Sequence, residues 1–531
     1  MIVPLALLLI GPIAGAVVAG AVGDLPYARR IAGAVFAATM LAGAAYGLQR
    51  AVSHAGVAWR GFTLDPWRGL LACGAAFAIA VAVIGDDESP AASGRQAAIF
   101  AAGAALMVPL VVPGVHLLAV GLVAGTIGYG VAAFAVAPDG ASSLRAARST
   151  LALAVSDGVA LAALGASLGR GVALPVHPST TMAALLLAAA AIRLGLAPVA
   201  GPAADATRAD RALSLLWHGP VRAQGFLLAL MAIGSGRNLA HAAAALAAFS
   251  LATSAYAIVH RDEAQGLTSF ATGVALLGFG VGGATATWGG VLALAGAFAA
   301  FPAWQTNAKG SPIARSFLAA IPAGAVLPGV ALVAGSTLAA STTRPWFAAL
   351  AVPLVAAAAA TIPSLWQPRG SAAGATHGRS FGFATSSIGL AAALAIAAVP
   401  VRAASGLGVP VAATLGTGRL LSIGGDPGIS AVLAVVIVAV AAVAFIAAPI
   451  AARPAIGPAD GAPADRDTAE LVSDRPGLFA WWAVAPDGPV VLGERAMETT
   501  RRWAIAAAIL IALSAGLALR VYVVAAGRGF L

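Results

Sequence analysis

The sequence predicts an all-α fold: a polytopic membrane helix bundle of about 14–16 spanning helices, some of them discontinuous. Composition is the first reason, because 60% of the 531 residues are apolar, 9% are charged and the mean hydropathy is +0.93. A soluble domain carries about 25% charged residues. Block length is the second reason, because the apolar residues fall in blocks of roughly 18–25 residues, which cross a ~30 Å hydrocarbon core as helices.

The first block, 1–23, has no basic region before its apolar stretch and is followed by Arg29 and Arg30. We therefore expect a first spanning helix rather than a cleaved signal peptide. The stretch 266–303 holds two short blocks, and the sequence leaves the boundary between them open. In chain order, the further blocks are 30–48, 66–85, 96–113, 114–137, 149–168, 180–200, 212–234, 238–259, 266–284, 286–303, 314–338, 345–365, 381–400, 428–452 and 501–525.

Polar stretches divide the chain into three predicted parts. Residues 1–452 form the transmembrane bundle, 453–500 form an extramembrane polar segment, and 501–531 hold a last spanning helix and a tail. The polar segment includes Trp481 and Trp482, which favours either a surface helix that docks on a neighbour or a plain connector. The Gly/Ser-rich stretch 366–380 is predicted to be a loop.

Small residues dominate the predicted helices, and they let helices pack closely in lipid. The glycine-rich run GFGVGG at 278–283 lies in apolar sequence, so we interpret its glycines as packing positions rather than a phosphate-binding loop. No Walker lysine, dinucleotide-binding fingerprint or His-Glu-x-x-His motif is present in the sequence. Cys73 is the single cysteine, which excludes an intramolecular disulfide framework. We expect neither a cofactor nor a metal, and no catalytic residue.

The net charge of +10 comes from arginine, since Lys309 is the only lysine. The arginines are dispersed at helix ends, where they indicate topology rather than nucleic-acid binding. An outside amino terminus places eight arginines in inward loops against five in outward loops, which favours that orientation. The inward set is Arg29, Arg30, Arg95, Arg145, Arg148, Arg208, Arg211 and Arg261; the outward set is Arg50, Arg60, Arg68, Arg170 and Arg237.

Four ionisable residues fall inside predicted spans, where a charge is costly and marks a functional hypothesis. They are Asp157, Arg193, His218 and Arg222. Asp262 and Glu263 stand at a helix start instead, where a carboxylate is structurally ordinary. The four residues form the candidate ion pathway.

Prolines follow two of these residues closely: Pro198 comes after Arg193, and Pro220 comes after His218. Proline frees backbone carbonyls in a spanning helix, and broken helices at mid-membrane line many ion pathways. The alternative is that Arg193 and Arg222 pair with Asp157 or with freed carbonyls and only hold the bundle together. Histidine can carry a proton near neutral pH, whereas arginine cannot release one.

Five segments, in this order, resemble the antiporter-like family of proton-conducting membrane subunits. That family includes subunits L, M and N of NADH:quinone oxidoreductase, the large subunits of Mrp antiporters and the membrane subunit of DAB-type inorganic-carbon complexes. The matching region covers about two fifths of the chain, from about 60 to 285. The segments are FTLDPWRGLL (62–71), YGVAAF (129–134), AARSTLALAVSDG (146–158), AAIRLGLAPVAGPAADATRADRALSLLWHG (190–219) and HRDEAQGLTSFATGVALLGFG (260–280).

The resemblance implies an antiporter-like fold and a broken seventh helix, with Asp157 on the family's aspartate and Arg193 on its lysine. This chain departs from the family at other polar positions. The fifth-helix glutamate falls near Leu122, the lysine of the Asp-x-Lys segment falls on Ala264, and Lys309 is no counterpart of the later lysine.

Two functions therefore stay open. The first is an antiporter-like subunit of a complex I-like or inorganic-carbon accumulation complex, with a role in proton or cation translocation. The second is a degenerate scaffold that anchors a peripheral catalytic subunit without conducting ions. Both imply a multi-pass protein of the cell inner (plasma) membrane, with lipid and other subunits as partners and no nucleic acid. No nucleophile–base or metal constellation favours an enzyme that acts alone.

Overall fold

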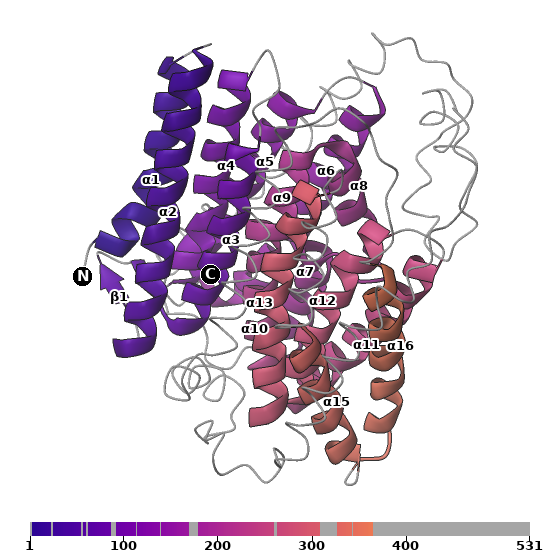
Figure 1. Cartoon of the computed structure of the whole chain (residues 1–531). Helices are drawn as coiled ribbons and strands as arrows, with labels where there is room; N and C mark the ends of the chain where they lie inside the picture. Colours follow the sequence, from indigo (N-terminus) through magenta and orange to yellow (C-terminus); the bar gives the residue numbers. More distant parts are fainter. Residues whose placement is uncertain are drawn as a thin grey trace, which may run out of the picture.

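The computed structural model describes residues 3–22, 25–54, 57–59, 62–85, 92–112, 114–137, 140–168, 179–259, 263–307, 326–341 and 344–364. These residues form a bundle of helices (Figure 1). The first half contains α1 (Val3–Val22), α2 (Pro26–His54), α3 (Pro66–Ile84), α4 (Ala92–Val111), α5 (Val115–Val136), α6 (Ala141–Leu168) and α7 (Thr180–Leu194). The second contains α8 (Gly201–Ala209), α9 (Arg211–Leu216), the π-helical segment η1 (Trp217–Val221), α10 (Arg222–Ile233), α11 (Arg237–Val259), α12 (Glu263–Val281), α13 (Ala284–Asn307), α15 (Leu327–Ser341) and α16 (Phe347–Ser364).

The all-α fold class is confirmed, with one small addition. Strands β1 (Val57–Trp59) and β2 (Phe62–Leu64) form an antiparallel hairpin between α2 and α3. The chain then enters α3 through Asp65, whose side chain caps the helix by accepting from the backbone N–H of Arg68 at 2.9 Å. Pro66 at the first helical position suits this start, because its missing N–H is not needed there.

Six helices in the described part of the chain, α1 to α6, are long and apolar enough to cross a membrane. Four shorter apolar helical stretches follow: Thr180–Leu194, Ser269–Val281, Ala286–Ala299 and Phe347–Ala358. The predicted blocks at 381–400, 428–452 and 501–525, and the polar stretches 366–380 and 453–500, lie outside the described residues. The chain is thus a multi-pass membrane protein.

Several predicted blocks have different bounds in the structure; block 30–48, for example, is part of the longer α2, Pro26–His54. Block 149–168 was too short, because α6 begins at Ala141 with polar turns that extend beyond the apolar stretch. Block 180–200 was too long, because α7 ends at Leu194. Block 212–234 is one continuous rod built from α9, η1 and α10. The open cut within 266–303 falls at Gly282 and Gly283, which have φ of 74° and 82° and separate α12 from α13.

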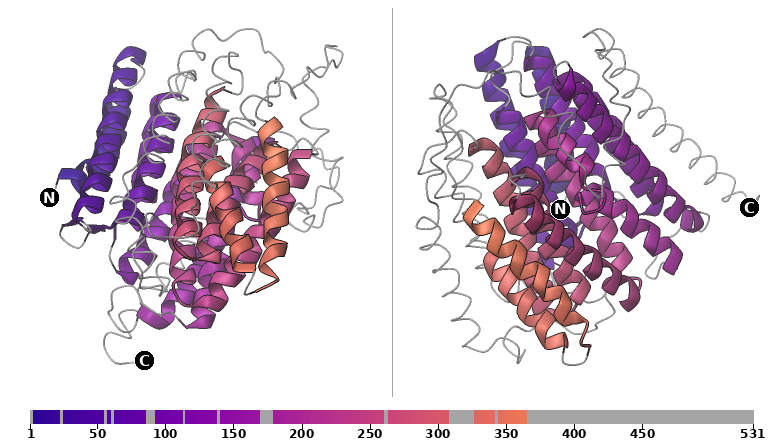
Figure 2. Two further views of the ribbon diagram at one scale, coloured as in Figure 1. Left: turned by 60° about the horizontal axis from the view of Figure 1, so that its bottom comes forward. Right: turned by 90° about the vertical axis from the view of Figure 1, so that its right-hand side faces the viewer.

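The helices form two flanks around a central group. Helices α1 and α2 pack on each other at one flank, and α15 and α16 lie at the opposite flank, beside α11 to α13 (Figures 1 and 2). Glycine brings backbones into contact, as sequence composition suggested. A Cβ added at Gly329 would lie 2.7 Å from the carbonyl oxygen of Gly289, so α13 and α15 touch through this pair.

Arginines predicted for inward loops gather at one end of the bundle. Arg95 at the start of α4 forms an ion pair with Asp210 at 3.1 Å, and Arg145 of α6 donates to the carbonyl oxygen of Arg208 at 3.4 Å. Arg211 donates to the carbonyl oxygen of Gly85 at 3.5 Å. These contacts join loops that are distant in sequence. They support the sorting of these arginines into one set, while the orientation itself stays a prediction.

Candidate functional site

Helix α7 ends at Leu194, before the end of its predicted block 180–200, and the residue that ends it is Gly195. Gly195 has φ of 66°, a left-handed conformation that favours glycine. Its N–H donates to the carbonyl of Ile192 at 3.2 Å, and the N–H of Leu196 donates to that of Ala191 at 3.0 Å. This is a Schellman motif, in which the turn satisfies carbonyls that the helix leaves unpaired. Pro198, which the sequence predicts to break the helix, comes only after this turn.

The break places Arg193 in the last turn of α7, fully buried. Its guanidinium group donates to three side chains on two other helices. One donation goes to Oδ1 of Asp157, with which it forms an ion pair, and one goes from Nε to Oγ of Ser156 at 3.1 Å; both residues lie on α6. The third goes to Oε1 of Gln224 on α10. The predicted partnership between Arg193 and Asp157 is present.

Two of these partners are themselves held in place. The amide nitrogen of Gln224 donates to the carbonyl oxygen of Leu106 on α4 at 2.7 Å, and the hydroxyl of Ser156 donates to the carbonyl of Ala189 at 3.0 Å. Helix α10 approaches because residue 225 is glycine: a Cβ there would lie 3.0 Å from Cβ of Arg193. The polar network therefore ties α4, α6, α7 and α10 together, and every one of its side chains is buried.

The carboxyl group of Asp157 is only half satisfied. Within the described residues, neither its Oδ2 atom nor the hydroxyl of Thr126 on α5 makes a hydrogen bond of normal geometry, although Thr126 lies close enough to interact with the carboxyl group. Both atoms are fully buried, and a buried polar atom without a protein partner is where an ordered water is expected. Leu122, the position that resembles the family's glutamate, is buried on the same helix one turn before Thr126. Helix α5 therefore contributes the hydroxyl of Thr126 to this part of the bundle. Its residue at the family's glutamate position, Leu122, contributes no carboxylate.

His218 and Arg222 form a second buried pair, on the α9–η1–α10 rod. An arginine side chain can only donate, so Arg222 donates to Nδ1 of His218 at 2.5 Å. Nε2 of His218 then donates to the hydroxyl of Thr207 on α8 at 2.9 Å, and Thr207 donates to the carbonyl of Ala203 at 2.8 Å. In this arrangement His218 is neutral, with its proton on Nε2.

Pro220 does not break its helix, contrary to the sequence expectation. The rod continues from α9 into α10 through five π-helical residues, Trp217–Val221, with Pro220 inside them. The wider π turn accommodates a residue that cannot donate to the preceding turn, and such segments often occur at functional sites. The ring of Trp217 packs edge-on against Tyr129 of α5 with centroids 6.0 Å apart. Tyr129 also shares a hydrogen bond with Ser149 at 3.2 Å.

The sequence pattern indicated the ionisable members of both pairs but not the neutral residues beside them. Ser156, Gln224 and Thr126 are polar residues within spans and Thr207 lies on the short helix α8, but each type is also common in helices that carry no function. A signal existed for Gln224 alone, since an amide within a spanning helix is rarely left without a partner. Of the other residues that the sequence singled out, Glu263 and Ala264 begin α12. Asp262 and Lys309 lie outside the described residues.

Chemically, the two clusters can hold charge and protons. In the part of the chain that the structure describes, no three His, Cys, Asp or Glu side chains come together as metal ligands. Asp157 and His218 are the groups that can exchange a proton, and each is hydrogen-bonded to an arginine that cannot.

Comparison with known proteins places this geometry in a fold. No family model and no curated protein matches the sequence. The chain is similar to a chain of the Mrp complex from Dietzia sp. DQ12-45-1b, with 17% identity and a TM-score of 0.64 over 96% of this chain and 59% of that one. This chain therefore spans less than two thirds of the Mrp chain.

Two structures of respiratory complex I from Thermus thermophilus also contain similar chains. In the structure with bound NADH the identity is 20% and the TM-score 0.56, over 79% of this chain and 100% of that one. In the structure with bound aureothin the values are 16% and 0.55, over 74% and 97%. This chain therefore has the antiporter-like fold found in membrane subunits of Mrp complexes and respiratory complex I.

Proposed function

We propose that the chain is an antiporter-like subunit of a multi-subunit, energy-coupled complex of the cell inner (plasma) membrane, and that it contributes to proton or cation translocation. One observation carries the proposal: a fully buried ion pair, Asp157–Arg193, lies at the end of a broken spanning helix and leaves one carboxylate oxygen without a hydrogen bond of normal geometry among the described residues. A charge at such a depth is costly, so a chain that keeps one there is expected to use it.

The arrangement assigns different tasks to the two ionisable types. Arg193 and Arg222 stay charged, so they act as fixed positive charges that set the local field. Asp157 can take up a proton at Oδ2, the oxygen that does not bond Arg193, and protonation weakens its attraction to Arg193. His218 can take up a proton at Nδ1 only when Arg222 moves away from that atom. Ion movement past these groups is therefore coupled to a rearrangement of the two arginines.

The composition of the complex identifies the partners of this chain. Both classes of similar structure are named as complexes, which supports membrane subunits as partners of this chain. A respiratory complex I-like set and an inorganic-carbon accumulation set with a role in bicarbonate transport are the two proposed assemblies. Mass spectrometry of the complex that co-purifies with this chain distinguishes them, because the first brings quinone-reductase subunits and the second a zinc-containing carbonic-anhydrase-like subunit.

A second candidate function, a scaffold without ion conduction, is favoured by a specific feature. The guanidinium group of Arg193 is already engaged with Asp157, Ser156 and Gln224, and a buried network with its donors satisfied rigidifies a bundle. The apolar Leu122 at the position that resembles the family's glutamate agrees with such a role. The chain would then anchor a peripheral catalytic subunit.

Proton uptake into vesicles that contain the reconstituted complex tests both candidates. Asp157→Asn, Arg193→Ala and His218→Ala are compared with Thr337→Val, a buried control whose hydroxyl bonds only its own helix, at the carbonyl of Val333. Translocation predicts that the first three variants lose uptake in assembled complexes while the control keeps it. Unchanged uptake in Arg193→Ala and His218→Ala would remove these residues from the ion path. Loss of assembly without this chain, with uptake indifferent to all four variants, indicates the scaffold.

A further inference from the structure

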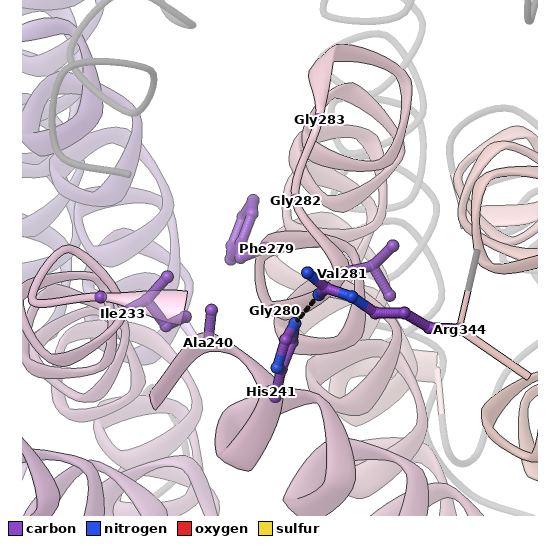
Figure 3. A pocket seen from close by; sticks show the side chains of 10 residues that line it. Ile233, Ala240, His241, Phe279, Gly280, Val281, Gly282, Gly283 and Arg344 are labelled. Carbon is purple, nitrogen blue, oxygen red and sulfur yellow. Dashed lines mark hydrogen bonds between the residues drawn. The ribbon is translucent and has the colours of Figure 1, made fainter. Parts of the chain in front are cut away.

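A separate cavity of about 280 Å³ lies where α10 ends, α11 begins, α12 ends and α13 begins. Figure 3 shows Arg344 and His241 facing each other at this cavity, with Phe279 and Val281 nearby. None of its lining residues belongs to the two polar networks described above. This volume lies just below the range of about 300–1,000 Å³ that is usual for ligand pockets, so the cavity has room for a small group only.

Arg344 supplies the positive charge of the cavity. Its guanidinium group donates to Nε2 of His241 at 2.7 Å, so that nitrogen is an acceptor and the histidine is neutral. Within the described residues no carboxylate pairs with Arg344, and one guanidinium group has five N–H donors. His241 is itself held by edge-on contacts with Trp346 and Phe347, at centroid distances of 5.2 and 5.4 Å. Arg344 thus has donors left for an anion.

The glycines at the end of GFGVGG contribute backbone to the same cavity. Gly278 and Gly280 are packing positions, as predicted: a Cβ at Gly280 would lie 2.7 Å from the carbonyl oxygen of Ala240. Gly282 and Gly283 differ, because a Cβ at either would meet nothing within 4 Å. Both line the cavity, and α13 begins directly after them. The N–H groups of its first turn have no partner within the helix and favour an anion.

Position in the fold indicates the depth of this cavity. The turns 234–236, 282–283 and 344–346 meet there, at the ends of spanning segments and opposite the end that carries Arg95 and Asp210. Trp346 is 43% exposed beside it, as expected for an aromatic side chain at a membrane–water interface. Ile233, Phe279 and Val281 give the rest of the lining an apolar character.

We infer that this cavity binds a phosphate-class oxyanion through Arg344 and the backbone N–H groups after Gly282, with the phosphate of a phospholipid headgroup or free phosphate as its source. The site is independent of the proposed ion path, because it shares no residue with it. Basic pockets between spanning helices at the headgroup layer bind lipid phosphates by this chemistry. The apolar lining favours a ligand that carries a glycerol or acyl portion.

Thermal unfolding of the purified full-length protein in detergent tests the inference, with dioctanoyl phosphatidylglycerol and inorganic phosphate as separate probes. A lipid site predicts that the short-chain lipid raises the unfolding temperature, that phosphate alone does not, and that Arg344→Gln weakens the apparent affinity about tenfold. A rise with phosphate alone identifies a free-oxyanion site. Arg50→Gln is the matched control, since Arg50 lies on α2 and does not line the cavity.

A second variant tests the cavity even where the Arg344→Gln protein does not fold. Ala240→Leu keeps Arg344 and fills part of the cavity, so it also weakens the response to the probe. Equal responses of the wild type, Arg344→Gln and Ala240→Leu to both probes would overturn the inference, as would no response of the wild type to either probe.

Discussion

The guanidinium group of Arg193 forms an ion pair with Oδ1 of Asp157 between α7 and α6, and both side chains are fully buried. The pair joins the end of a broken helix to the middle of a continuous one. Its stability rests on the neutral donors and acceptors around it, since a buried pair recovers its desolvation cost only with further hydrogen bonds.

The first prediction concerns the energy of this pair. Asp157→Asn and Arg193→Gln each leave a buried group without its charged partner, so each lowers the free energy of unfolding by about 3–5 kcal/mol. The double variant loses less than the sum of the two. Unfolding in detergent, followed by intrinsic fluorescence, measures the cycle. Thr337→Val is the control, because it removes one neutral hydrogen bond, to the carbonyl of Val333, worth about 1 kcal/mol. Additive losses would contradict a direct coupling.

The second prediction concerns water beside Asp157. An ordered water is expected beside Oδ2 of Asp157 and the hydroxyl of Thr126, because neither atom makes a hydrogen bond of normal geometry among the described residues. A high-resolution cryo-EM map of the complex should show it, and Thr126→Val should remove it and reduce proton uptake. Thr150→Val serves as a control, since Thr150 bonds the carbonyl of Ala146 on its own helix at 2.8 Å. A dry site in the wild type refutes this prediction.

The third prediction concerns the turn that ends α7. Gly195→Ala forces a Cβ into a left-handed residue and places it 2.6 Å from Cβ of Ala203, so stability should fall by about 1–3 kcal/mol. Gly158→Ala is the matched control on α6, where an added Cβ meets nothing within 4 Å. That change should raise helix stability by about 0.5–1 kcal/mol. Unfolding temperatures of the two variants should therefore move in opposite directions, and a parallel shift would argue against a strained turn.

The fourth prediction separates proton exchange at His218 from its structural contacts. Glutamine can keep a hydrogen bond to Thr207 but does not titrate, so His218→Gln should assemble normally and lose proton uptake. His116→Gln on α5 is the control for a histidine outside both networks. Normal uptake by assembled His218→Gln complexes would show that His218 only supports the fold.

Hydropathy and charge were enough to predict the membrane bundle and most of its helices. The reason is physical: a span in lipid must be helical and about 20 apolar residues long, so the pattern is local. The same cost of burying charge made Asp157, Arg193, His218 and Arg222 visible as candidates. Ordered motifs around these residues indicated the antiporter-like fold.

The tertiary structure decided what those residues contact. Ser156 and Gln224 satisfy Arg193 from α6 and α10, and no local pattern records which helix faces which. It also decided where helices end: Gly195, rather than Pro198, ends α7. Pro220 lies within a π-helical segment and does not interrupt its helix. Both outcomes depend on packing against neighbours across the bundle. The sequence was enough to predict a helical membrane bundle with Asp157, Arg193, His218 and Arg222 buried inside it, and the packing of the helices determined which partners these residues contact.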